Sequence, residues 1–249
     1  MVEFDNLKKE DKNEAVMNYN EPIPDLVMAN DRELQFSFID EPFVKVESSK
    51  RIRIQMMYPI LGMKNAVNEC FMRKTVYEKL IEASEKLPEE YGFCIWDAWR
   101  PFLLQKELYD TYALMILKEF KKESLPEKEK HEFLLKYIGD PIKDPFDSPA
   151  HTTGGAVDLT LTKDGEILKL GTEFDAFTPK TNTNHFEKQD DEIRDLRRLL
   201  YNVMKKAGFT NLPTEWWHYD YGDNNYAKMS GREVIYTGVF EIKEMKMHV

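Results

Sequence analysis

The chain has 249 residues, enough for one large domain or two small ones with a substantial core. Its composition, 42% hydrophobic and 32% charged, is typical of a globular protein and unlike that of a disordered chain. The formal net charge of −10 argues against a nucleic-acid-binding protein, because such proteins need a concentrated positive surface to follow phosphates.

The N-terminal segment, residues 1–35, is polar and is interrupted by Pro22 and Pro24. This composition predicts an arm that packs on a single domain formed by residues 36–249. The segment starts with charged residues and lacks the apolar stretch of a secretion signal. We therefore expect a cytoplasmic protein, although a secreted chain whose signal had been removed would start in the same way.

Periodic patterns predict the elements of the first half of the domain. Apolar and polar residues alternate over 51–58, and segment 92–99 is short, apolar and aromatic, so both are expected to be strands. Apolar residues at helical spacing predict three helices, over 75–87, 104–121 and 126–138. The longest uninterrupted apolar run, 113–117, is far shorter than the roughly 20 residues that span a bilayer, so no membrane association is expected.

A proline-rich segment, 139–150, is expected to form a rigid loop before the second half of the domain. Segment 156–162 alternates and is β-branched, which predicts a strand, and 191–207 has the apolar stripe of an amphipathic helix. Segments 215–221 and 233–242 are expected to be strands. Because strands and helices do not alternate regularly, the pattern favours an α+β fold in which helices flank a mostly antiparallel sheet.

Two segments carry the residue types of a zinc site. His151 precedes Asp158 by seven residues, and Glu215 precedes His218 by three. Two histidines and a carboxylate form a recurrent catalytic zinc set, in which a second carboxylate can act as base for water. A straight strand would separate His151 from Asp158 by about 23 Å, so we expect the chain to fold back at 154–155 and to bend between Glu215 and His218. Each residue taken alone fits a structural role, such as a surface hydrogen bond, better than a metal site, and only their joint occurrence favours a site.

Five segments together match the motifs of a known family. The segments are SPAHTTGGAVDLTL (148–161), EWWHYDYG (215–222), DAWRP (97–101), LGTEFD (170–175) and, more weakly, YPILGM (58–63). They resemble motifs of the VanX-type D-alanyl-D-alanine dipeptidases, which have His, six residues, Asp and a later Glu-x-x-His. The resemblance implies a zinc D,D-peptidase whose fold is shared with the Hedgehog signalling domain.

The resemblance also implies a role for each site residue. His151, Asp158 and His218 would hold one Zn²⁺ and leave a position for water. Glu215 would act as the general base, taking a proton from the metal-activated water and returning it to the leaving amine. Arg100 would stabilise the negative charge that develops on the carbonyl oxygen.

The substrate-binding residues follow the family motifs less closely. Asp175 would bind the free ammonium group of the substrate. Many members carry a serine two residues before the first zinc histidine, but position 149 is proline here and Ser148 stands one residue earlier. A substrate-binding role for Ser148 therefore stays open, and the sequence identifies no residue that binds the substrate carboxylate.

The implied activity is hydrolysis of the small dipeptide D-Ala-D-Ala to D-alanine. This reaction consumes a dipeptide used to make peptidoglycan for the cell wall. The sequence leaves three physiological roles open: antibiotic resistance, dipeptide scavenging and wall turnover. Two alternatives remain: a D,D-carboxypeptidase or endopeptidase acting on longer peptidoglycan peptides, and a non-catalytic zinc-containing binding module. The first needs an open groove, whereas segment 103–150 is expected to close a pocket. A non-catalytic binding module needs neither a general base nor a group that stabilises developing charge. The presence of both Glu215 and Arg100 therefore argues against this second alternative.

Overall fold

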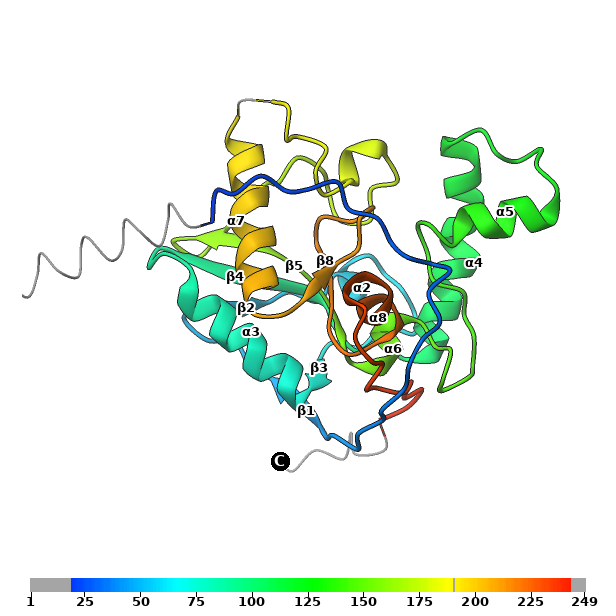
Figure 1. Ribbon diagram of the computed structural model, residues 1–249, viewed down its shortest axis with the longest axis horizontal. Coiled ribbons are helices and arrows are strands. Elements are labelled where there is room, and N and C mark those ends of the chain that lie inside the picture. The colour runs from blue at the N-terminus through cyan, green and yellow to red at the C-terminus, as the bar shows by residue number, and fades with distance from the viewer. Residues whose placement is uncertain (1–18, 190, 243–249) are drawn as a thin grey trace, which may run out of the picture.

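The computed structural model describes residues 19–189 and 191–242, and its centre is a six-stranded sheet (Figure 1). The strand order is β2-β4-β5-β8-β7, with β6 paired to β5. The strands are β2 (Ile52–Ile54), β4 (Tyr91–Asp97), β5 (Ala156–Lys163), β6 (Glu166–Ile167), β7 (Thr210–Asn211) and β8 (His218–Asp220). Neighbouring strands are antiparallel except for β2 and β4, which are parallel. The predicted α+β class is therefore confirmed, with a sheet that is mixed and not purely antiparallel.

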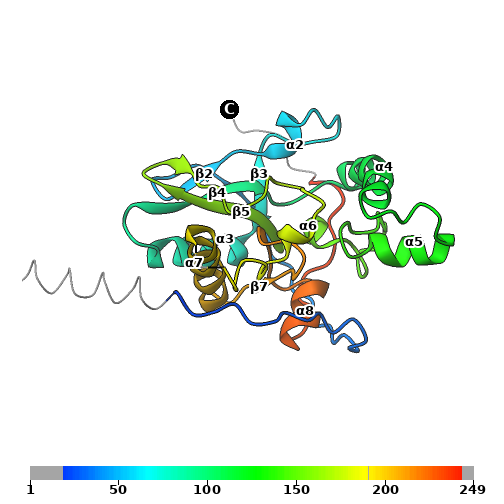
Figure 2. The same ribbon diagram turned by 90° about the horizontal axis from the view of Figure 1, so that it is seen from above.

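Two helices, α3 (Lys74–Lys86) and α7 (Glu192–Lys206), cover one face of this sheet (Figure 2). The apolar stripe of α7 is buried, as its periodicity predicts, and Asp191 caps the helix by accepting a hydrogen bond from the backbone N–H of Arg194. The main core lies between these helices and the strands. Its fully buried members include Val76, Leu80, Phe93, Ile95, Leu159, Leu161 and Val203.

A second helical layer, α4 (Phe102–Glu119) with α5 (Glu127–Leu134), lies at one end of the sheet (Figure 1). It has its own apolar cluster, which consists of Tyr58, Leu104, Leu108, Ile116, Leu117, Leu134 and Ile138. A segment without regular structure leads from α5 to the short helix α6 (Ala150–Thr153), as the proline-rich loop predicts. Within residues 19–189 and 191–242, no helix is both long and apolar enough to cross a membrane.

Several short elements differ from the sequence predictions. Segment 51–58 forms only β2 and then turns into the helix α2 (Met57–Ile60). Segment 233–242 is not a strand, because its backbone bonds to loops and makes a single bridge, Phe36 with Val234. Other elements were not predicted, since each is too short to show a period. They are the strands β6 and β7, the helix α6, β1 (Phe43–Val46), its antiparallel partner β3 (Cys70–Arg73), the 3₁₀ helix η1 (Pro179–Thr181) and α8 (Asn224–Ser230).

The described part of the N-terminal segment, from Tyr19, runs past α7 and α8 (Figure 2). Near its start, the side-chain amide of Asn202 in α7 donates hydrogen bonds to the backbone oxygens of Tyr19 and Glu21. Further along, Arg32 donates to the oxygens of Ala227 and Lys228 at the end of α8. The chain between these two anchors is therefore held across the domain surface.

The turn between α6 and β5 brings His151 and Asp158 to the same place, as the sequence requires. Gly154 ends α6 with a left-handed backbone (φ 74°), and a Cβ atom added there would overlap the ring of Phe43. We expect Gly154→Ala to lower the free energy of unfolding by about 2–4 kcal/mol, since it combines backbone strain with overpacking.

Urea unfolding of the metal-free protein measures this loss. Gly165→Ala is the matched control, because Gly165 has a similar backbone (φ 85°) but no atom within 4 Å of the added Cβ. The control should lose only the backbone contribution, about 1–2 kcal/mol. Equal losses in the two variants would show that the contact with Phe43 adds nothing.

Candidate active site

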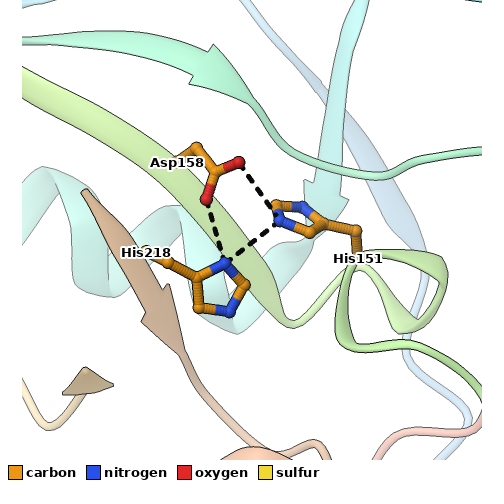
Figure 3. A group of neighbouring side chains, drawn as sticks. All are labelled: His151, Asp158 and His218. Atoms are coloured by element: carbon orange, nitrogen blue, oxygen red, sulfur yellow. Dashed lines mark hydrogen bonds and ion pairs between the residues drawn. The ribbon is translucent and has the colours of Figure 1, made fainter. Parts of the chain in front are cut away.

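Three buried side chains converge where β5 and β8 meet α6 (Figure 3). His151 comes from α6, Asp158 from β5 and His218 from β8. The antiparallel register places Asp158 directly opposite His218, and the turn at Gly154 folds His151 back over them. The structure thus brings together the three residues that the sequence analysis singled out as metal ligands.

The donor atoms of this cluster have the spacing of a small coordination site. His218 Nδ1 lies 3.0 Å from Asp158 Oδ1, and His151 Nε2 lies 3.3 Å from Asp158 Oδ2 and 3.2 Å from His218 Nδ1. Tetrahedral zinc with ligands at about 2.0–2.2 Å needs donors roughly 3.3–3.6 Å apart. Small adjustments of these side chains would therefore let all three bind one metal ion.

The charges in the cluster also suit a cation. Burial opposes ionisation of Asp158, but the imidazoles of His151 and His218 outweigh it and hold its pKa well below the usual range. Burial likewise opposes protonation of His218, yet the carboxylates of Asp220 and Asp158 raise its pKa well above the usual range. The carboxylates thus attract positive charge to this point, and a divalent metal ion would supply that charge in place of a proton.

Glu215 lies beside the cluster on a bend that precedes β8. The backbone N–H of Glu215 donates to Leu212 O, and that of His218 donates to Glu215 O, so the chain turns here as the i, i+3 spacing requires. Glu215 Oε2 is 3.9 Å from His218 Nδ1, and the side chain is 18% exposed. Burial raises the pKa of Glu215 to about 8, which suits a group that exchanges a proton near neutral pH.

Arg100 approaches the cluster from the segment between β4 and α4. Its guanidinium donates hydrogen bonds to Asp97 at 2.9 Å, Gln105 Oε1 at 2.7 Å and Tyr58 OH at 3.1 Å. Nη2 also lies 3.8 Å from Asp158 Oδ2. Arg100 therefore forms an ion pair with Asp97 and at the same time lies close to the cluster. The sequence analysis singled out neither Tyr58 nor Gln105 for this contact, because it depends on how α2 and α4 pack beside the end of β4.

The two predicted substrate-binding residues have different surroundings. Asp175 lines the cavity next to the cluster, and its buried Oδ2 atom has no hydrogen-bond partner among the described residues. Burial raises the pKa of Asp175 to about 7. Ser148 also lines the cavity, but its Oγ is packed against Gly238, where an added Cβ would overlap it, and lacks a partner within residues 19–189 and 191–242.

The cluster opens into a cavity of about 830 Å³, within the range of small-molecule sites. One wall comes from α4 and the segment that follows α5, both within segment 103–150, and another from the N-terminal segment and α8. Residues on these two walls include Leu108, Tyr112, Ile138, Leu26, Met28 and Lys228. The cavity is larger than two alanine residues need, so it extends well beyond the cluster itself.

Comparison with known proteins finds a matching family and several similar proteins. The sequence model of the M15 peptidases, described as D-ala-D-ala dipeptidase, matches residues 48–232. The chain is 27% identical to the D-alanyl-D-alanine dipeptidase of Synechocystis sp. over 175 residues, which cover 63% of this chain and 71% of that protein. It is also 27% identical to the D-alanyl-D-alanine dipeptidase of Enterococcus faecium over 202 residues, which cover 78% of this chain and 95% of that protein.

Proposed function

The chain belongs to the D-ala-D-ala dipeptidase family of M15 peptidases, and we propose that it hydrolyses D-Ala-D-Ala to D-alanine with one zinc ion. The observation that carries the proposal is the convergence of His151, Asp158 and His218 beside Glu215 in a cavity. The proposed reaction removes a small dipeptide used for the cell wall, and we propose that it takes place in the cytoplasm.

The three ligands and their chemistry fit zinc. Two imidazole nitrogens and one carboxylate oxygen form a common set for catalytic zinc, which keeps one position free. When bound, Zn²⁺ would supply Lewis-acid polarisation of the scissile carbonyl and would lower the pKa of water. The side chains of the cavity account for the remaining steps.

Glu215 is proposed as the general base and acid. Its carboxylate takes a proton from the attacking water and then returns it to the leaving amine. The bend at 212–218 holds this carboxylate next to His218 and outside the set of three ligands. A pKa raised by burial supports this assignment, because the group must both accept and release a proton during one turnover.

Arg100 is proposed to stabilise the negative charge that develops on the carbonyl oxygen. Asp97, Gln105 and Tyr58 hold its guanidinium at the cluster before any substrate arrives. A donor that is already oriented costs no rearrangement at the moment of reaction, and a single such donor is worth about 10²–10³-fold in kcat.

Asp175 is proposed to bind the free ammonium group of the dipeptide. Asp175 lines the cavity, and a cationic donor bound beside it would supply the partner that its buried Oδ2 atom lacks among the described residues. An ammonium bound there would favour the ionised carboxylate, against the burial that now raises its pKa. The enzyme should therefore require a substrate with an unblocked amine.

The test of the proposed function compares hydrolysis of D-Ala-D-Ala with that of N-acetyl-D-Ala-D-Ala by the zinc-loaded protein. We expect the free dipeptide to be preferred by about 10²–10⁴-fold in kcat/KM, because a blocked amine leaves the buried Oδ2 atom of Asp175 without a partner. Comparable rates would favour a D,D-carboxypeptidase, for which the large cavity leaves room. Failure of the zinc-loaded protein to hydrolyse either compound would favour a non-catalytic binding module.

Asp175→Asn should remove most of this preference. We expect kcat/KM for D-Ala-D-Ala to fall about 10–100-fold, the range of one hydrogen bond to a charged group, while the slow rate with the acetylated compound changes little. Asp147→Asn is the control, because Asp147 also lines the cavity but is exposed. Equal effects of the two substitutions on D-Ala-D-Ala would contradict the role proposed for Asp175.

A further inference from the structure

A buried carboxylate lies behind His218, on the side that faces away from the cluster. His218 Nε2 is 2.7 Å from Asp220 Oδ1, a short hydrogen bond between two fully enclosed side chains. Asp220 follows His218 by two residues in β8, so both side chains leave the strand on the same side. The sequence shows this spacing, but only the structure shows that the imidazole ring connects Asp220 to the cluster.

The position of Asp220 is fixed by the sheet. Its backbone pairs with Ala156 of β5 on one side and with Thr210 of β7 on the other. A residue held by strands on both sides cannot shift easily, so its carboxylate provides a rigid acceptor for the imidazole. The other cluster histidine has a different arrangement, because His151 Nδ1 lies 2.7 Å from the neutral backbone oxygen of Ala98, while the nearest carboxylate oxygen, Asp97 Oδ2, is 3.5 Å away and beyond a good hydrogen bond.

We propose that Asp220 is a positioning residue of the metal site, which keeps the proton of the His218 ring on Nε2 and the lone pair of Nδ1 directed at the metal. A carboxylate acceptor also makes the ring a stronger donor to the metal than a neutral acceptor does. The two histidines would thus contribute unequally to metal affinity. This inference rests on the proposed function, since it assumes that His151, Asp158 and His218 bind the ion.

Asp220→Asn tests the proposal in the full chain, because it keeps the size of the side chain and removes its charge. The measurement is the zinc dissociation constant, obtained by competition with a chromogenic chelator. We expect it to rise about 10–100-fold. Zinc affinity equal to that of the wild-type protein would overturn the proposal.

Asp223→Asn is the matched control. Asp223 is equally buried and close to Asp220, and it caps α8 by accepting a hydrogen bond from the backbone N–H of Tyr226 at 2.8 Å. Burial and the neighbouring Asp220 carboxylate raise the pKa of Asp223 well above the usual range. Asparagine keeps the size of this side chain and an oxygen that caps the helix. Its zinc affinity should stay close to the wild-type value, and a loss as large as that of Asp220→Asn would overturn the proposal.

A second measurement needs no substitution and therefore no variant that must fold. In the zinc-loaded wild-type protein, ¹⁵N NMR of the His218 ring should show a protonated Nε2 and an unprotonated Nδ1. The opposite assignment would overturn the proposal. A wild-type protein that binds no zinc would instead contradict the proposed function itself, and the inference would fail with it.

Discussion

Replacement of Glu215 by glutamine is expected to lower kcat for D-Ala-D-Ala by about 10²–10⁴-fold while zinc remains bound at one ion per chain. The substitution keeps the size of the side chain but removes the carboxylate that accepts the proton of water. The three proposed ligands, His151, Asp158 and His218, are unchanged. KM should change little, because proton transfer contributes to the transition state and not to binding of the ground state.

Steady-state kinetics and metal analysis of the same preparation separate the possible outcomes. Loss of zinc from the Glu215→Gln protein would make Glu215 a ligand. Turnover close to the wild-type rate would show that Glu215 takes no part in the reaction. Either result would contradict the role proposed here.

His218→Ala should lose zinc and activity together. The substitution removes one of three proposed donors and leaves the carboxylates of Asp158 and Asp220 without the ring that lies between them. We expect substoichiometric zinc after dialysis and no D-Ala release above background. His185→Ala is the control, because His185 is exposed and its ring meets that of Phe186 edge-on, so both properties should be retained. A His218→Ala protein that retains full zinc would contradict the proposed ligand set.

The elements with strong periodicity were predictable from the sequence. The helices α3, α4 and α7 and the strands β4 and β5 begin and end within two residues of the predicted bounds. Their apolar residues repeat over enough turns or alternations to identify both the element and its buried side. The short strands β1, β3, β6 and β7 offer no such repeat, because pairing with distant segments stabilises them more than their own sequence does.

Part of the site was also predictable, from the spacing of its residues along the chain. The spacing of His151, Asp158, Glu215 and His218 required two bends, and the structure has both, at Gly154 and between Glu215 and His218. The support of Arg100 by Tyr58 and Gln105 could not be predicted, because it depends on how α2 and α4 pack around β4. The shifted serine was equally uninformative, since only the structure shows Ser148 packed against Gly238.

The most direct test of a zinc-dependent dipeptidase is D-alanine release from D-Ala-D-Ala by the metal-free protein during titration with Zn²⁺. We expect no release before zinc is added and a linear rise that ends at one equivalent per chain, since His151, Asp158 and His218 form one cluster. Full activity of the chelator-treated protein, or no activity after one equivalent has bound, would contradict this account.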